Sequence, residues 1–464
     1  MTHTRIRHLF GALALSTLLL ALASCGGGGT GVPSDGSTVI ANPNNGGSEG
    51  SAGGTDGAGD GNSGDSASSG GIGGTGGTPG DGSSGDTGTA DSGGGGGGIG
   101  GTGSPSTAGT VHFYLADAPS CGYDAVYVTV QKVRIHASGG ATDSDTGWSE
   151  VIQVPPKRVD LLTLTNGVLA DLGQTSLAAG KYTQLRLVLA ENGAMAPFPN
   201  AVVPTGGPET ELKVPSGSQS GLKIDADVDV VAGKTTQLVL DFDACKSVIR
   251  RGNSGQFNLR PVISAIPLAS EVGLRVTGYV AAGLANASTK VSVQLDGVPV
   301  RSTAPESTGR FVLYPVPSGA YDLVVTSGGR VSAVVTGVPV TMAAPTVVSS
   351  AGRPIDPPPS IERGVSGTVN PPSATVRALQ ALSGGRLVEV GWAPVDALGG
   401  AFGFTLPADS PIRAPYVSDP GTLAFIVDPT AGANVVLEAT LATQRKTQPV
   451  NLLSSPSSVT FTFP

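Results

Sequence analysis

Aromatic, charged and histidine side chains are scarce in this chain, and their scarcity narrows the functions open to it. Of its 464 residues, 5% are aromatic, 13% are charged and four are histidines. The formal net charge is −8, and eight acids but no lysine or arginine lie between residues 26 and 109. The remainder is therefore close to neutral, and we expect no nucleic-acid binding, which needs a basic surface.

Motifs for catalysis and metal binding are also missing. The sequence has no HExxH and no CxxC, so zinc has no ligand set. His112 and His136 both fall in predicted strands, where we interpret them as packed or surface residues. Residues Gly46 to Gly50 spell a serine-hydrolase elbow, but it lacks the preceding strand and following helix that the mechanism needs. We therefore expect no enzyme activity, no metal and no cofactor.

The first 25 residues have the features of a signal segment. A basic start precedes an apolar run over residues 9–22, which is shorter than the roughly 20 residues that span a bilayer. The tetrad Leu22-Ala23-Ser24-Cys25 resembles the bacterial lipobox, whose cysteine is acylated and becomes the new N-terminus. We predict lipidation of Cys25 and, because Gly26 follows it, anchoring in the outer membrane, facing the periplasm or the cell surface. The alternative is an ordinary secretory peptide with an incidental cysteine.

Two cysteines, Cys121 and Cys245, remain after Cys25. An even pair in an oxidising compartment favours a disulfide, which would close a loop of about 125 residues and add about 4–5 kcal/mol of stability before any strain. The alternatives are two buried thiols or a reactive nucleophile. No local pairing of histidine with cysteine occurs, so we predict the disulfide.

Residues 26–109 contain mainly Gly, Ser, Asp, Thr and Ala and no aromatic residue. Such a segment cannot bury enough apolar surface to offset the entropy of ordering. We expect a disordered linker with a root-mean-square span of roughly 50 Å, which would let the folded part stand away from the membrane.

From residue 110 the pattern changes to alternating apolar and polar residues, which predicts strands. In the segment 124–136, Val126, Val128 and Val130 share one face. The segments 223–231 and 235–242 flank a short turn and predict a hairpin. Residues 159–172 are the best candidate for a helix, but Asn166-Gly167 interrupts them and predicts a turn instead.

Five acids in this region are a weak candidate for a calcium site. Asp225, Asp227 and Asp229 alternate and so share a face, and in a hairpin Asp241 and Asp243 could join them. The interpretation that we prefer is a solvated strand face with the neighbouring valines pointing inward.

Several ordered motifs in this region resemble one known family. They are Leu115-Ala116-Asp117-Ala118-Pro119, Asp160-Leu161-Leu162, Gly180-Lys181-Tyr182-Thr183-Gln184, Leu240-Asp241-Phe242-Asp243 and Leu259-Arg260-Pro261-Val262-Ile263. Together they resemble domain-of-unknown-function family 4382, over a predicted domain of residues 110–268. The resemblance implies a bacterial secreted or lipid-anchored β domain, and it implies no activity.

Two further units follow. Residues 272–352 resemble the carboxypeptidase-regulatory-like and prealbumin-like β-sandwiches, with Gly309 expected to bend the chain before an inward Phe311. Residues 361–464 echo that unit, since Val365-Ser366-Gly367-Thr368-Val369 matches Val276-Thr277-Gly278-Tyr279-Val280. The proline-rich residues 353–360 between the units predict a stiff extended spacer.

The sequence as a whole predicts a mainly β protein: a disordered tether, one β domain and two tandem sandwiches. The function that it favours is a non-enzymatic, lipid-anchored envelope protein that presents binding modules. By analogy with the fold of the β-sandwiches that these units resemble, glycan is the first ligand class, and an envelope protein is the second. Trp148 and Trp392 are the two tryptophans, which we interpret as core residues rather than a sugar-stacking platform. The alternatives are a purely structural spacer and, third, a hydrolase whose site is not recognised.

Overall fold

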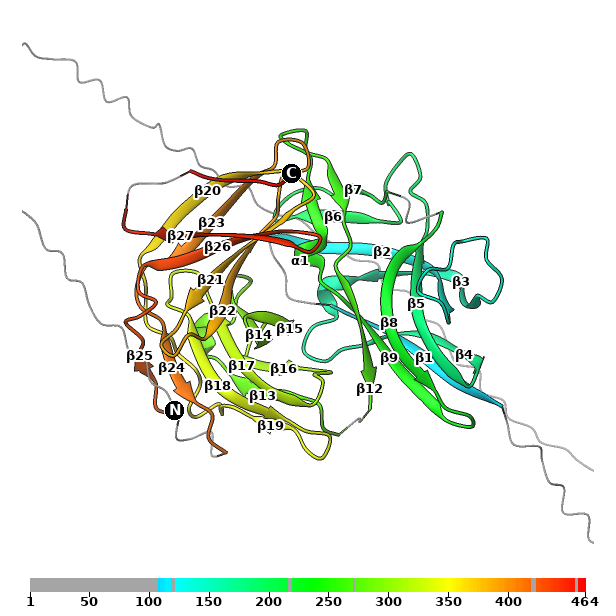
Figure 1. Cartoon of the computed structure of the whole chain (residues 1–464), viewed down its shortest axis with the longest axis horizontal. Helices are drawn as coiled ribbons and strands as arrows, with labels where there is room; N and C mark the ends of the chain where they lie inside the picture. The colour runs from blue at the N-terminus through cyan, green and yellow to red at the C-terminus, as the bar shows by residue number, and fades with distance from the viewer. Residues whose placement is uncertain (1–106, 118–121, 216–218, 270–271, 419–422, 455–457) are drawn as a thin grey trace, which may run out of the picture. The chain divides into compact units, whose positions relative to one another are not determined.

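The computed structural model describes residues 107–117, 122–215, 219–269, 272–418, 423–454 and 458–464 (Figure 1). The predicted signal, Cys25, nearly all of the predicted linker and Cys121 lie outside these residues. Within them, helix is confined to α1 (Ala244–Ser247) and two single 3-10 turns, η1 (Leu161–Thr163) and η2 (Ala282–Leu284). All other regular structure is strand, which confirms the mainly β prediction. No helix in the described ranges is long and apolar enough to cross a membrane.

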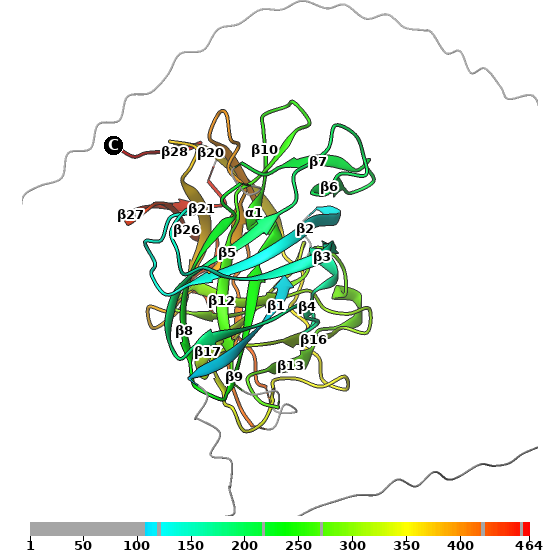
Figure 2. The ribbon, with the colours of Figure 1, turned by 90° about the vertical axis from the view of Figure 1, so that its right-hand side faces the viewer.

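The first domain consists of two sheets that share one core. The smaller sheet has the order β12 (Ile263–Leu268), β9 (Thr235–Phe242), β1 (Ala108–Asp117), β4 (Ala170–Ala178). The larger has the order β10 (Val248–Arg250), β11 (Phe257–Leu259), β7 (Thr210–Lys213), β6 (Ala201–Pro204), β2 (Tyr123–His136), β5 (Gly180–Leu189), β8 (Leu222–Val230), with β3 (Ser149–Asp160) paired to β2. Figure 2 shows β1 beside β4.

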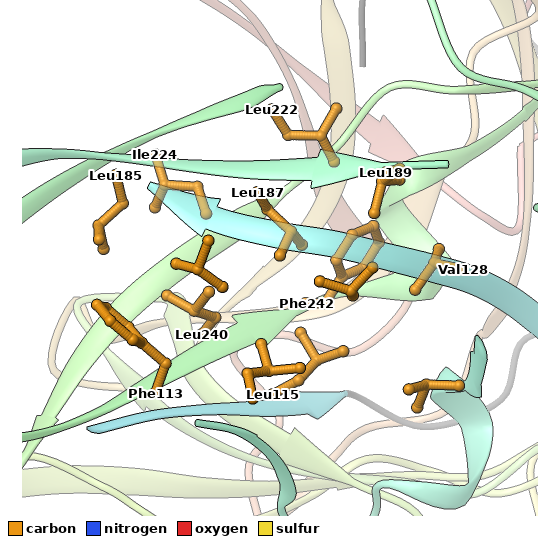
Figure 3. Close-up of a cluster of buried hydrophobic side chains, with 14 of the residues drawn as sticks. Phe113, Leu115, Val128, Leu185, Leu187, Leu189, Leu222, Ile224, Leu240 and Phe242 are labelled. Atoms are coloured by element: carbon orange, nitrogen blue, oxygen red, sulfur yellow. The ribbon is translucent and has the colours of Figure 1, made fainter. Parts of the chain in front are cut away.

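Alternation in the sequence explains which side chains fill this core. Val126, Val128 and Val130 are fully buried on one face of β2, as predicted. Figure 3 shows Phe113 and Leu115 of β1 facing the apolar side chains of the larger sheet across the core. The first domain is therefore a β-sandwich. The inward-facing residues of the strands in its two sheets form the core between them.

The predicted hairpin of residues 223–231 and 235–242 is wrong. Strand β8 pairs antiparallel with β5, whereas β9 pairs in parallel with β1 and antiparallel with β12. The chain does turn between them, where the Lys234 amide donates to the Val231 carbonyl at 3.0 Å. The turn carries the chain from one sheet to the other, because the apolar faces of β8 and β9 line the same core from opposite sides.

The two C-terminal units have the same strand order. In the first repeat the sheets are β16 (Arg310–Leu313), β13 (Val276–Tyr279), β19 (Thr346–Val347) and β15 (Val298–Thr303), β14 (Lys290–Leu295), β17 (Gly319–Thr326), β18 (Ala333–Val340). In the second they are β23 (Ala401–Pro407), β20 (Glu362–Asn370), β28 (Val459–Thr462) and β22 (Leu387–Ala393), β21 (Thr375–Ala381), β26 (Asn434–Leu441), β27 (Gln444–Asn451). Corresponding pairs also agree in being parallel or antiparallel. The echo in the sequence is thus a repeat in the structure.

Glycines at matching positions show how closely the repeats agree. A Cβ at Gly278 would lie 2.5 Å from the Phe311 ring, and one at Gly367 would lie 2.5 Å from the Phe402 ring. Both repeats also carry a bulge at the same place, after Val293 of β14 and after Ala378 of β21. These bulges align Val291 with Val376.

Two segments lie apart from the repeat pattern. Strands β24 (Ile412–Pro415) and β25 (Ile426–Val427), which follow β23 in the chain, extend the four-stranded sheet of the first repeat through β18. In the segment predicted as a spacer, Ile355 is 1% exposed and bridges to Val280. Both segments therefore add to the core of the first repeat.

Candidate functional site

The predicted cysteine sites fall mostly outside the described residues. Cys25 and Cys121 both lie there, and Cys245 is in helix α1. Lipidation at Cys25 and pairing of Cys121 with Cys245 therefore stay predictions.

The three acids of β8 lie on its solvent face. Asp225, Asp227 and Asp229 are exposed, and the residues between them face inward or are half-buried. The Asp227 carboxylate is 2.6 Å from the Lys181 ammonium across the strand pair, and both side chains are more than half exposed. This arrangement matches the solvated face that the alternation predicts.

Of the other two acids, Asp241 lies in the other sheet and Asp243 directly follows its strand, and both contact other groups. Asp241 forms an ion pair with Arg301 of the first repeat. Asp243 is the N-cap of α1 and accepts a hydrogen bond from the Lys246 amide at 3.0 Å. The structure does not bring the five acids together, because β8 and β9 are not neighbours. Among the described residues no group of three His, Cys, Asp or Glu side chains could hold a metal ion.

Both histidines have polar partners at the surface. The His112 ring lies between Asp171, 2.8 Å from Nε2, and the Tyr114 hydroxyl, 3.1 Å from Nδ1. The hydrogen bond from the Gly173 amide, and then that from His112, lower the pKa of Asp171. His136 contacts the loop that follows β2, where the Thr146 carbonyl is 3.0 Å from its Nε2. These contacts are those expected of surface histidines.

The two tryptophans are partly buried and pack against cations. The Arg134 guanidinium lies 4.5 Å from the centre of the Trp148 ring, and the Trp148 indole donates to the Thr142 carbonyl at 2.9 Å. The Lys246 ammonium lies 4.9 Å from the centre of the Trp392 ring. Trp148 thus fixes a loop of the first domain, and Trp392 lies where that domain meets the second repeat.

The turn at Asn166 and Gly167 forms a second contact between the first domain and the first repeat, besides the ion pair of Asp241 with Arg301. Both residues have a left-handed backbone conformation, with φ of 56° and 81°, as the predicted turn requires. The Asn166 side-chain oxygen accepts from the Val312 amide at 3.0 Å, and its Nδ2 donates to the Ala304 carbonyl at 2.9 Å. The backbone amide of Asn166 donates to the Thr303 hydroxyl at 3.0 Å. One carboxamide therefore bridges β16 and the loop before it.

A second turn of the first domain contacts the matching loop of the second repeat. The Gly252 amide donates to the Asp396 carboxylate, and the Ala397 amide donates to the Arg250 carbonyl at 3.1 Å. Asp396 matches Glu306, since each accepts a backbone bond from the glycine that precedes β23 or β16. The first domain thus contacts the same loop in both repeats.

Buried charges lie between α1 and the second repeat. The Lys246 ammonium is 3.4 Å from the Asp243 carboxylate and 3.7 Å from that of Glu389, which is 5% exposed. Burial disfavours the charged form of Lys246, but these carboxylates outweigh burial and raise its pKa. Burial, followed by the charge of Lys246, lowers the pKa of Lys290. Sequence patterns do not reveal this cluster, because its members come from three units.

The two repeats also contact each other through side-chain amides. Gln294 Nε2 donates to the Glu389 carbonyl at 2.9 Å, and the Glu389 amide donates to Gln294 Oε1 at 2.7 Å. Asp322 accepts two bonds from Arg386, at 2.6 and 2.7 Å. Contacts of this kind fix the orientation of one repeat on the other, because each carboxamide or carboxylate is bound at two points.

The pocket with the most apolar lining among those described lies where the first domain meets the second repeat. Its volume is about 450 Å³. It is lined by Arg250, Gly252, Asn253, Pro394, Val395, Asp396, Ala401, Phe402 and Gly403. A concave site of this size with a few polar groups is typical of ligand binding.

Comparison with known families assigns the first domain. Residues 108–261 match the family Domain of unknown function (DUF4382). This confirms the resemblance of the first domain, and the match covers about a third of the chain. No curated protein matches the chain.

Solved structures show only partial similarity. A type II cohesin–X-dockerin complex from Acetivibrio cellulolyticus is 23% identical over 19% of this chain and 59% of that chain, with a TM-score of 0.16. A second mutant of that complex gives 24% identity, 18% and 56% coverage and a TM-score of 0.15. A streptococcal ancillary pilin is 7% identical over 76% of this chain and 98% of that chain, with a TM-score of 0.14. The chain thus spans less than two thirds of the cohesin–dockerin chains.

Proposed function

We propose that this chain is a non-enzymatic lipoprotein of the bacterial outer membrane whose β modules form one binding head. The DUF4382 domain and the two repeats would be presented at the end of a flexible linker anchored by the lipid on Cys25. The two repeats would be modules of the carboxypeptidase-regulatory-like type, supported by their shared seven-strand order.

One observation carries the idea of a single head. The DUF4382 domain contacts the same loop in both repeats, through Asn166 in one and Gly252 in the other. Domains of one chain move relative to one another unless contacts between them hold their orientation, and these polar contacts supply such a constraint. The arrangement supports a head that presents surfaces formed jointly by several modules.

The ligand class that we propose is glycan, with an envelope protein as the second candidate. The alternative function is a structural spacer with no ligand. A glycan array probed with the purified Cys25→Ser chain separates the two. Reproducible binding of one glycan class supports the binding head, and an array without binding favours the spacer.

The anchor is tested by metabolic labelling with a palmitate analogue. We predict that Cys25→Ser abolishes the label and moves the protein from the membrane fraction to the soluble fraction, because several acyl chains are needed for stable anchoring. Cys245→Ser is the matched control and should keep the label. Equal labelling of the Cys25→Ser chain and the wild type would contradict the anchor.

A further inference from the structure

The pocket beside β23 occupies the place that the Asn166 carboxamide fills in the first repeat. The matching glycines and bulges align Phe402 with Phe311, Gly403 with Val312, and Pro394 with Ala304. In the first repeat, the Val312 amide and the Ala304 carbonyl both bind the side chain of Asn166. In the second repeat, Gly403 and Pro394 line the open pocket.

The backbone of β23 presents a donor to this pocket. Antiparallel partners alternate between pairs that exchange backbone hydrogen bonds and pairs whose groups point outward. The Val369 amide donates to Gly400, whereas the Ala401 carbonyl points outward and accepts from the Asp396 amide at 2.8 Å. Gly403 lies two residues further along the same strand, so its backbone N–H and C=O groups point outward as those of Ala401 do. Its amide therefore points away from β20, as the Val312 amide does in the first repeat.

The pocket therefore offers the same pair of backbone groups that already bind a carboxamide elsewhere in the molecule. We propose that it binds an asparagine-tipped turn of a partner protein, with the asparagine oxygen on the Gly403 amide and its nitrogen on the Pro394 carbonyl. This inference rests on neither the lipid anchor nor a glycan ligand. Arg250 and Asn253 at the rim add polar groups for the flanking backbone of the turn.

A polypeptide fits these observations better than a sugar does. The occupant of the matching site is itself a turn, and β23 is an end strand of its sheet, where backbone groups bind other chains. Phe402, the aromatic residue in the lining, is 5% exposed and leaves little ring face for a sugar to stack on.

The test uses saturation-transfer NMR on the full chain carrying Cys25→Ser. The probe is a cyclic peptide that displays the sequence of residues 164–168, with a second peptide in which the asparagine is alanine. We expect the asparagine peptide to bind and the alanine peptide to bind about tenfold more weakly, because both side-chain hydrogen bonds are lost.

Gly403→Pro identifies the site, because proline removes the backbone donor that the proposal assigns to Gly403. An edge strand tolerates proline where the amide faces away from the neighbouring strand, and a Cβ at Gly403 has ordinary van der Waals room. Gly403→Val is the matched control, since it keeps the amide and gives the residue that binds Asn166 in the first repeat. We expect Gly403→Pro to abolish binding and Gly403→Val to preserve it, with melting temperatures that show both variants to be folded.

Three results with the peptides would overturn the proposal. They are no binding of the asparagine peptide to the wild type, equal binding of the two peptides, and binding that Gly403→Pro leaves unchanged. A fourth is binding of N-acetylglucosamine, without peptide binding, that Gly403→Pro abolishes; it would instead make this a site for sugar acetamido groups.

Discussion

At the scale of single residues, the Asn166 side chain supplies two of the hydrogen bonds between the DUF4382 domain and the first repeat. Asn166→Ala removes the bonds to Val312 and Ala304 and places alanine at a φ of 56°. We expect the free energy of unfolding to fall by about 2–3 kcal/mol, measured by urea denaturation. Asn166→Asp keeps the acceptor and tolerates the left-handed backbone, so its loss should be smaller. Equal losses would show that the acceptor contributes nothing and that the loss of the donor accounts for the whole effect.

Asp396 makes the contact with the second repeat sensitive to acid. Hydrogen bonds from the Gly399 amide, and then from those of Gly252 and Leu398, lower the pKa of its carboxyl below the usual value despite some burial. A lowered pKa contributes stability above the pKa of the unfolded chain, about 3.9. That stability is lost as the pH falls through the lower, folded value.

We therefore predict that wild-type unfolding becomes easier as the pH falls below about 4, with a smaller drop for Asp396→Asn. Urea denaturation between pH 2 and pH 6 measures both. Asp409→Asn serves as the control, because Asp409 binds within the second repeat rather than across this contact. The same acid dependence in wild type and Asp396→Asn would contradict the role of Asp396.

The residues of the candidate site could be predicted only in part. Sequence identified the turn at Asn166, because Asn-Gly dipeptides favour left-handed turns. It did not reveal the partners of that turn, since Thr303 is 137 positions away along the chain. It gave no signal for Gly403 either, because one glycine in an alternating strand shows nothing about what lies beside it.

At the scale of elements, the glycines before β16 and β23 should be equally sensitive. Gly309 and Gly400 have φ of 82° and 65°, and a Cβ at either would lie 2.2 or 2.0 Å from a backbone carbonyl oxygen. We expect Gly309→Ala and Gly400→Ala each to lower the free energy of unfolding by about 3 kcal/mol, measured by chemical denaturation.

Gly329→Ala is the matched control for this pair. Gly329 has a φ of 70°, but no atom lies within 4 Å of the place that a Cβ would take. We therefore expect its free energy of unfolding to fall by only about 1 kcal/mol, the cost of the left-handed backbone. If Gly400→Ala behaved like Gly329→Ala while Gly309→Ala did not, the two repeats would not share this turn.

The elements show what alternation can and cannot predict. It located β2, because Val126, Val128 and Val130 alternate with other residues and share one buried face. It could not choose the partner of β9, since the same alternation suits a hairpin with β8 and a parallel pairing with β1. The repeat was visible because residues 365–369 match residues 276–280, with Gly367 at the position of Gly278.

At the scale of the whole molecule, the described modules form one compact unit within residues 96–464. Buried charged and amide groups link them, among them Arg301, for which burial lowers the pKa to about 10 against the opposing charge of Asp117. Removing one partner of a buried pair is costly, because the other charge is left without compensation. The modules should therefore depend on one another for stability.

Calorimetric unfolding of the full chain carrying Cys25→Ser tests this central claim most directly. We predict a single transition in which the DUF4382 domain and both repeats unfold together, and we predict that Asn166→Ala lowers its midpoint or splits it. Three independent transitions in the wild type, with Asn166→Ala affecting none of them, would show that the modules are separate units and would contradict the account of a single head.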